Sequence, residues 1–393
     1  MKPVWPRRRL TEVAQLVGGS TPARDTPEYW GGDIPWVTPT ELPMPGEGIA
    51  SIAATAQTIT RAGLDSCAAV LVPPGTVLFS SRATIGKLAV AEVPLATNQG
   101  FANFIPRSII TPRFLAYVLW FHMEDIAHLA GSTTFKEVSR GRLANFEIPL
   151  PPPPEQERIV RILDVAEELR RLRAQADRRT ADLIPALFYD MFGDPAINPN
   201  GFERLPLDRV CERITDGTHQ PPPFAAEGLP FLFVKNIVKG YIDFNTEKSI
   251  TEDTYIELTR RVRPERGDIL YSTVGSYGVA VQVETDQRFA FQRHIGHIKP
   301  VRSRIDSAFL SAQLNTPFVR AQADKRARGV AQKTVNLAEI RQFQVLVPPL
   351  PLQRQFAARV AEIRALEARQ AESRRRLDDL FASLLHRAFQ GEL

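Results

Sequence analysis

The sequence contains one long pattern twice, and this repeat limits the possible folds more than any other feature. The segment LTEVAQLVGGST, which starts at Leu10, returns from Leu207 as LDRVCERITDGT. Three later segments also return: GTVLFSSRATIG as GDILYSTVGSYG, LATNQGFANFIP as FAFQRHIGHIKP, and LANFEIPLPPPPEQE as EIRQFQVLVPPLPLQR. The matched positions near the start are Leu10, Val13, Val17 and Thr21 with Leu207, Val210, Ile214 and Thr218. A period this long exceeds the roughly 20–50 residues of solenoid repeats, so each copy is predicted to be a whole domain.

Composition indicates a globular protein. The chain has 393 residues, 44% of them hydrophobic and 24% charged, which suits two or three folded domains. The net charge of +5 permits a polyanionic partner without requiring one. Only two cysteines occur, at non-equivalent places in the repeat, so no disulfide framework is expected. Neither a membrane-spanning run nor a secretory signal is recognisable, and we expect a cytoplasmic protein with no membrane partner.

Each copy changes character at a proline cluster. Short β-branched and aromatic runs come first and predict strands, whereas the segments after PLPPPP and VPPLPLQ predict long helices. The expected fold class is α+β, with two tandem mixed α/β domains, each followed by a long helix. The expected boundaries are 1–150 and 194–347 for the domains, the second with its linker, and 151–193 and 348–393 for the helices. Pro185 should interrupt the first helix near its end.

The two long helices carry apolar residues at heptad-like spacing and need a partner for that stripe. The predicted seam positions are Ile159, Ile162, Ala166, Leu169, Ala176 and Leu183 in the first helix, and Val360, Ile363, Leu377, Leu380 and Leu384 in the second. One interpretation is an antiparallel coiled coil with pseudo-twofold symmetry, which would hold the two domains a fixed distance apart. The alternative is that each helix folds back on its own domain.

Motifs for catalysis are missing from the sequence. It has no Walker A loop, no dinucleotide-binding glycine pattern, no nucleophile elbow and no zinc-protease motif. His294 and His297 have no partner at metal-ligand spacing, so they are interpreted as polar surface or as contacts to base edges. We therefore expect no catalytic, metal-binding or cofactor-binding residue in this chain.

Polar loops at equivalent places in the two copies are the candidate binding residues. They combine charged groups suited to phosphates with amides and hydroxyls suited to base edges. In the first copy the candidates are Thr38, Thr40, Ser81, Arg82, Thr84, Lys87, Asn98, Gln99, Thr133 and Lys136. In the second copy they are Lys235, Asn236, Thr273, Ser276, Tyr277, Gln292, Arg293, His294, Gln332 and Lys333. The framework residues of the two copies agree, whereas these polar loop residues differ. This difference predicts two domains that recognise different halves of an asymmetric DNA target.

The opening LTEVAQLVGGSTPARDTPEYWGGDIPWVTPTEL, the loop TNQGF and the junctions IPLPPPPEQERIVRIL and VPPLPLQRQFAARV resemble the specificity (S) subunits of type I restriction-modification systems. The segment ALFYDMFGDPAINPNGFERLPL and the ending LLHRAFQGEL share the resemblance. The second copy departs from the family's Trp-Gly-Gly opening, having GTHQPPPF and GLPFLFVKNI instead.

This resemblance implies a non-catalytic subunit with two target recognition domains that read the halves of a bipartite site in double-stranded DNA. The helices would set the gap and dock two methyltransferase (M) subunits, with restriction (R) subunits as further partners. S-adenosylmethionine, ATP and Mg would belong to those partners. Three alternatives stay open from the residues alone: a protein–protein adaptor, a stand-alone DNA-binding regulator, and a nuclease or methyltransferase fragment.

Overall fold

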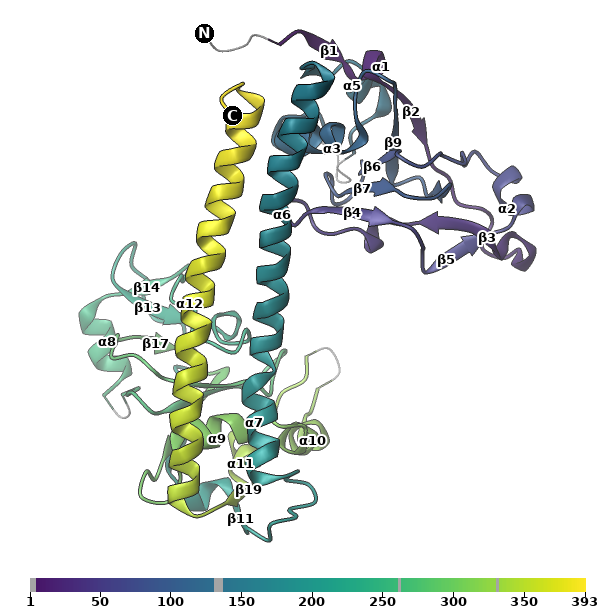
Figure 1. The fold of residues 1–393 in the computed structure, drawn as a ribbon. Helices are drawn as coiled ribbons and strands as arrows, with labels where there is room; N and C mark the ends of the chain where they lie inside the picture. Colours follow the sequence, from purple (N-terminus) through teal and green to yellow (C-terminus); the bar gives the residue numbers. More distant parts are fainter. Residues whose placement is uncertain (1–4, 131–136, 261–262, 330–331) are drawn as a thin grey trace. The chain divides into compact units, whose positions relative to one another are not determined.

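A computed structural model describes residues 5–130, 137–260, 263–329 and 332–393 of the chain. The chain forms two compact units, Met1–Ala174 with Glu372–Leu393, and Gln175–Ala371. Each unit contains one mixed α/β domain and a section of both long helices (Figure 1). The units thus divide both helices, whereas the four segments expected from the sequence keep each helix whole.

The domain of the first unit is built on a five-stranded sheet in the order β2-β9-β6-β7-β4. These strands are β2 (Ala14–Gly18), β9 (Phe101–Pro106), β6 (Val77–Ser80), β7 (Leu88–Ala91) and β4 (Ile49–Ile52). A three-stranded sheet and a strand pair complete it: β5 (Gln57–Ile59), β3 (Trp30–Val37) and β8 (Ala96–Thr97), and β1 (Arg7–Arg9) with β10 (Glu147–Pro149). Edge strand β4 runs parallel to β7.

The second unit repeats this arrangement almost strand for strand. Its main sheet has the order β12-β18-β15-β16, formed by β12 (Cys211–Asp216), β18 (Ile295–Pro300), β15 (Ile269–Ser272) and β16 (Ala280–Gln282). The smaller sheets are β14 (Ser249–Ile250), β13 (Leu229–Leu232) and β17 (Ala290–Phe291), and β11 (Glu203–Pro206) with β19 (Gln344–Val347). Among the described residues, the main sheet has no strand corresponding to β4.

The alignment of the two copies changes by one residue within their first long strand. The register of β12 with β18 shifts between Cys211 and Arg213, as a β-bulge with one extra residue produces. The prediction that Val17 and Thr21 correspond to Ile214 and Thr218 is therefore wrong. The structural counterparts are Leu16 with Ile214, which lie opposite equivalent strand residues, and Ser20 with Thr218.

Short helices cover the sheets and connect the strands. Helix α3 (Pro112–Phe121) in the first unit and α9 (Ser307–Leu314) in the second both contribute buried side chains to the main hydrophobic core of their unit. The other short helices are α1 (Leu10–Val13), α2 (Arg61–Asp65), α4 (Met123–His128), α5 (Arg140–Ala144), α8 (Glu252–Leu258), α10 (Pro317–Arg326) and α11 (Leu337–Arg341). Short 3-10 turns occur at Pro27–Tyr29, Pro39–Glu41, Leu207–Val210 and Val234–Asn236.

The long helices are α6 (Pro153–Ala181), α7 (Leu183–Phe192) and α12 (Leu350–Phe389). The interruption predicted at Pro185 is confirmed: α6 ends at Ala181 and α7 starts after Asp182. Proline has no amide hydrogen to donate to the carbonyl four residues earlier, which here belongs to Ala181. None of the described helices combines the length and apolarity that a membrane crossing needs.

Within each unit the helix sections run antiparallel, and the expected fold class is confirmed. In the first unit Arg158 donates to the carbonyl oxygen of Leu393 over 2.7 Å, and Arg170 pairs with Asp378. In the second, Gln370 donates to Thr180 over 2.9 Å. The helices also pack against their domains, because Ile159, Leu163, Phe381 and Phe389 share a buried cluster with α3. Inside each unit the helix sections therefore pack on one another and on their own domain.

The predicted seam is only partly buried. Ile159, Ala166 and Val360 are buried, whereas Leu169, Leu183 and Leu380 are exposed. The buried apolar positions that heptad spacing missed are Leu163, Phe188, Phe192, Phe356, Phe381, Leu385, Ala388 and Phe389. They face a domain as well as the other helix, so the apolar face is not the narrow seam of a two-stranded coiled coil.

Candidate nucleic-acid interface

Four loops of the first unit meet where their strands end. The amide of Ser20 donates to Thr97 over 2.9 Å, and the amide of Asn98 donates to Val37 over 3.1 Å. The amide of Ser81 donates to the carbonyl oxygen of Gly100 over 2.8 Å. These backbone contacts join the loops around residues 19–21, 38–40, 81–86 and 98–100. The candidate binding residues of the first copy that the structure describes therefore lie on adjoining loops.

The same meeting of loops occurs in the second unit. The amide of Thr218 donates to Phe291 over 3.1 Å, and that of Gln292 donates to Leu232 over 3.1 Å. The amide of Gly275 donates to Lys333 over 3.0 Å, which adds the loop around residues 332–334. Sequence comparison alone had no means to show that loops so far apart along the chain are neighbours.

A glycine fixes the first contact in each unit. A Cβ at Gly19 would lie 2.1 Å from the carbonyl oxygen of Asn98, and one at Gly217 would lie 2.0 Å from that of Phe291. Both distances are far below a van der Waals contact, so only glycine allows the backbones to approach. The sequence signal for this pair was the glycine shared by GGST and DGTH.

The loop after β6 has the same backbone shape as the loop after β15. The hydroxyl of Ser80 donates to the carbonyl oxygen of Thr84 over 2.6 Å, and that of Ser272 donates to Ser276 over 2.8 Å. At the tips, Ala83 and Gly275 have left-handed backbones, with φ of 58° and 67°. The two units therefore present different side chains on one loop conformation.

The candidate side chains differ greatly in exposure. Exposed candidates are Thr40, Arg82, Gln99, Lys235, Ser276, Arg293, Gln332 and Lys333. Half-buried candidates are Thr38, Thr84, Asn98, Gln292 and His294. Buried candidates are Ser81, Lys87, Asn236, Thr273 and Tyr277. Thr133 and Lys136 lie outside the described residues.

The buried candidates have structural contacts instead of free tips, which corrects their expected role. The ammonium group of Lys87 donates to the carbonyl oxygens of Pro39 and Leu42 over 2.7 and 3.3 Å. Asn236 accepts from the amide of Phe233 and donates to Asp243, so it closes a turn. These groups cannot reach DNA without leaving buried carbonyls and amides unpaired.

Three further candidates are corrected for the same reason. Tyr277 donates to Asp324 over 2.7 Å, and this hydrogen bond, together with burial, raises the pKa of the phenol. The hydroxyl of Ser81 lies 3.4 Å from the carbonyl oxygen of Gly100, and Thr273 lies buried between adjoining loops. Their side chains belong to the framework that shapes the loops.

Several exposed tips have neighbours that set their orientation. Arg82 forms an ion pair with Glu137 over 2.8 Å, and Lys235 pairs with Glu247. Thr21, which was not among the candidates, donates to Gln99 over 2.5 Å. Such exposed contacts are weak and can exchange for contacts with DNA.

Arg293 and His294 form one polar tip in the second unit. Burial and the positive charge of Arg293 lower the pKa of His294, which favours the neutral ring. The ring can then accept a hydrogen bond from Arg293 Nε over 3.3 Å. The guanidinium group keeps further donors for a phosphate or for guanine.

His297 is not at the surface, and this part of the prediction is wrong. Its ring is buried on β18 and lies 2.7 Å from Asp268, which also accepts from Lys299 over 3.0 Å. Burial tends to raise the pKa of Asp268, but hydrogen bonds from His297 and Lys299 outweigh it and lower that pKa. Among the described residues, no group of three or more His, Cys, Asp or Glu side chains could hold a metal ion.

The chain thus has two similar domains, each with a cluster of adjoining polar loops, and each packs on sections of the two long helices. Residues 4–176 match the model of the type I restriction modification DNA specificity domain. The chain is 27% identical over 90% of its length to the MjaIX specificity subunit of Methanocaldococcus jannaschii, and it covers 85% of that protein. It is 25% identical to the EcoBI specificity subunit of Escherichia coli, over 72% of this chain and 65% of that one.

Solved structures agree with this fold. A chain from work on the assembly and conformational transition of a type I R-M system matches with a TM-score of 0.60 and 20% identity, and each chain is fully covered. A type I S subunit from M. genitalium matches with a TM-score of 0.55 and 15% identity, over 98% of this chain and 96% of that one. The chain is therefore similar to type I restriction-modification specificity subunits along most of its length, and residues 4–176 match the DNA specificity domain of that family.

Proposed function

We propose that this chain is the DNA sequence-recognition subunit of a type I restriction-modification complex and that it reads a bipartite, asymmetric site. The observation that carries the proposal is the pair of loop clusters, which share one backbone design and differ in their exposed tips. The exposed Arg82 in the first unit corresponds to the buried Val274 in the second, and the exposed Gln99 corresponds to the exposed Arg293. Identical tips would favour a palindrome, whereas unlike tips favour two different half-sites.

The exposed candidates divide by chemistry into two roles. Lys235, Arg293 and Lys333 are cations suited to phosphate oxygens, and Arg82 can bind either phosphate or guanine. Amides such as Gln99 and Gln332 suit adenine, which they can contact with a donor and an acceptor at once. We assign the half-buried Thr38, Thr84, Asn98, Gln292 and His294 to the edges of these surfaces.

The chain itself is proposed to be non-catalytic, with two M subunits and additional R subunits as its partners. S-adenosylmethionine would then bind to the M subunits, while ATP and Mg would serve the complex outside this chain. For docking we propose an exposed apolar stripe on α6 that consists of Val165, Leu169 and Leu172. Their spacing places them on one helix face, and their exposed fractions are 63%, 45% and 46%. Exposed apolar residues grouped in this way are typical of interaction surfaces.

The long helices are proposed to set the gap between half-sites. Helix α12 is a single helix of 40 residues, and it contributes sections to both units. An uninterrupted helix is a suitable spacer because its backbone hydrogen bonds fix its length at about 1.5 Å per residue.

Selection from a random duplex library tests this function. The chain, purified together with its M subunits, is expected to enrich a site with two specific half-sequences and a fixed non-specific gap. A selection that enriches no bipartite sequence would contradict the proposal. If the chain is a protein–protein adaptor, the selection should also enrich no bipartite sequence, but the chain should still bind its protein partners.

A further inference from the structure

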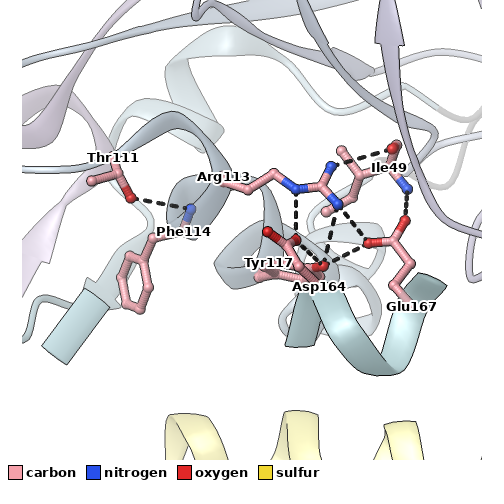
Figure 2. Close-up of polar contacts among 7 residues, drawn as sticks. All are labelled: Ile49, Thr111, Arg113, Phe114, Tyr117, Asp164 and Glu167. Atoms are coloured by element: carbon pink, nitrogen blue, oxygen red, sulfur yellow. Dashed lines mark hydrogen bonds and ion pairs between the residues drawn. The ribbon is translucent and has the colours of Figure 1, made fainter. Parts of the chain in front are cut away.

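A polar network in the first unit joins α3, β4 and α6 (Figure 2). Arg113 on α3 pairs with Asp164 over 2.9 Å and with Glu167 over 2.8 Å, both on α6. The hydroxyl of Tyr117, one turn further along α3, lies 2.7 Å from Asp164 and 2.6 Å from Glu167. Two carboxylates thus share one guanidinium and one phenol. We call these four residues the clamp.

The clamp holds the first residue of β4. The amide of Ile49 donates to Glu167 over 2.8 Å, and its carbonyl oxygen accepts from Arg113 over 3.3 Å. Since β4 is an edge strand, its outward backbone groups need partners from outside the sheet. Nearby, Arg170 of α6 donates to the carbonyl oxygen of Gly46 over 3.1 Å. The segment that leads into β4 is therefore attached directly to the long helix.

Electrostatics keeps the clamp in this arrangement. Burial raises the pKa of Tyr117, and the charge of Glu167 raises it further, so the phenol keeps its proton and donates it. Burial tends to lower the pKa of Arg113, but Tyr117, Glu167 and Asp164 outweigh it and raise that pKa. The Arg113 and Glu167 side chains are largely shielded from solvent, with exposed fractions of 29% and 13%. Such pairs are screened less by salt than those at the surface.

The segment fixed by the clamp is continuous with a candidate reading loop. Strand β3 ends at Val37, the loop with Thr38 and Thr40 follows, and β4 begins at Ile49. Lys87 holds the middle of this segment through the carbonyl oxygens of Pro39 and Leu42. The reading loop is thus fixed by the sheet at one end, by Lys87 in the middle and by the clamp at the other end.

The second copy keeps one helix anchor and lacks the clamp. In both units a buried glutamine of the long helix accepts from the amide of the residue that caps the start of the short helix: Gln156 from Thr111 over 3.0 Å, and Gln353 from Asp306 over 2.8 Å. Aligned on these anchors, the positions of Arg113, Tyr117, Asp164 and Glu167 hold Ala308, Ala312, Ala361 and Arg364. The clamp therefore occurs together with β4, in the first unit alone among the described residues.

We propose that Arg113, Tyr117, Asp164 and Glu167 are positioning residues that set base discrimination in one half-site only, the one read by the first unit. This inference rests on the proposed function and adds to it a specificity determinant that does not touch DNA. The hydrophobic contacts of α3 with α6 and α12 keep the domain in place without the clamp. Loss of the clamp thus removes one of the three attachments of the reading loop and leaves the domain and the gap unchanged.

The test compares Glu167→Gln and Tyr117→Phe with the wild-type chain, each bound to its M subunits. Binding is measured for duplexes with single mismatches in either half-site and with altered gaps. Because one mismatch costs roughly 1–3 kcal/mol, or about 5–150-fold, we expect discrimination in one half-site to fall by about tenfold. Discrimination in the other half-site and the preferred gap should equal those of the wild type.

Glu168→Gln is the matched control, because it removes an ion pair with Arg171 on the same helix, outside the clamp. It should leave both half-sites unchanged. Tyr117→Phe removes one hydroxyl and keeps the ring, so it serves if Glu167→Gln does not fold. Equal loss in both half-sites, or wild-type discrimination in both variants, would overturn the inference. A wild-type chain that selects no bipartite site would instead contradict the proposed function.

Discussion

Asp268 shows how one residue can stabilise the framework beneath a reading surface. It is buried directly before β15 and accepts through Oδ2 from His297, Lys299 and the amide of Glu265. A carboxylate only accepts, so Nε2 of His297 must carry a hydrogen. Three donors on one oxygen favour the ionised form, in agreement with the lowered pKa.

This arrangement predicts a dependence of stability on acid. Because the folded-state pKa of Asp268 lies below its unfolded value near 4, its contribution is full above that value and is lost as pH falls through the folded pKa. Asp268→Asn should destabilise the second unit at pH 7 by about 3–5 kcal/mol and show a smaller further loss below pH 4. Hydrogen exchange of β15 and β18 measures this, since a chain of two units need not unfold in one transition. An unchanged acid profile in the variant would contradict the assignment.

Lys87 and Lys333 are two lysines from the same set of candidates, and the structure separates their roles. Lys87→Met should lower the stability of the first unit by about 1–3 kcal/mol, because two carbonyl oxygens lose their donor. Lys87→Met should leave the salt dependence of DNA binding unchanged.

Lys333→Gln should leave the stability of the second unit unchanged. It should reduce the slope of log K for DNA binding against log salt concentration by about one. Binding titrations from low to moderate salt distinguish the two, and a lower slope for Lys87→Met would refute its structural role.

These two lysines also show what the sequence could predict. Comparison of the two sequence copies identified the loops, because polar residues occupy equivalent positions between matched framework residues. It could not decide which tips point inward, because that depends on carbonyl groups such as those of Pro39 and Leu42 on a different loop. The clamp gives only a weak signal in the sequence: Arg113 and Tyr117 are four residues apart, and Asp164 and Glu167 are three residues apart. Such spacings are common on exposed helix faces, and nothing in them identifies Ile49 as the partner.

At the scale of elements, the long helices could be predicted in extent and direction but not in their buried face. Apolar spacing identified the helices, and Pro185 marked the interruption. The spacing could not assign Phe381 and Phe389 to the core of the first domain, because their partners on α3 lie more than 250 residues earlier. Leu169 shows the opposite error, since it was predicted in the seam and is exposed.

The exposure of Leu169 leads to a prediction about partners. Leu169→Glu should weaken binding of an M subunit at least tenfold, because it introduces a charge into the centre of the apolar stripe. Folding should be little affected, since Leu169 is already 45% exposed. Calorimetric titration with purified M subunit gives the affinity, and Glu168→Gln on the same helix is the control. Equal affinities for the wild type and Leu169→Glu would exclude this stripe as the docking surface.

At the scale of the whole molecule, the chain passes between the units twice, at Ala174–Gln175 and at Ala371–Glu372. Seven residues inserted in one helix alone would shift the antiparallel contacts inside a unit. Seven inserted at both crossings keep the contacts of each unit and lengthen both helices by about 10 Å.

The double insertion should therefore change the gap and keep both half-sites. Since a base pair rises by about 3.4 Å, the preferred gap is expected to grow by about three base pairs. Selection from the random library reads out the half-sites and the gap together. Altered half-sites with an unchanged gap would show that the helices do not set the spacing.

The place of residues 372–393 has a consequence for biosynthesis. Phe381, Leu385 and Phe389 complete the buried cluster of the first unit, whereas the second unit is a continuous stretch of chain. On the ribosome, the domain that emerges first therefore lacks part of its core until the last turns of α12 are made. The second unit can fold earlier, although it is translated later. The nascent first domain keeps apolar surface exposed during this delay, and such surface promotes aggregation during folding.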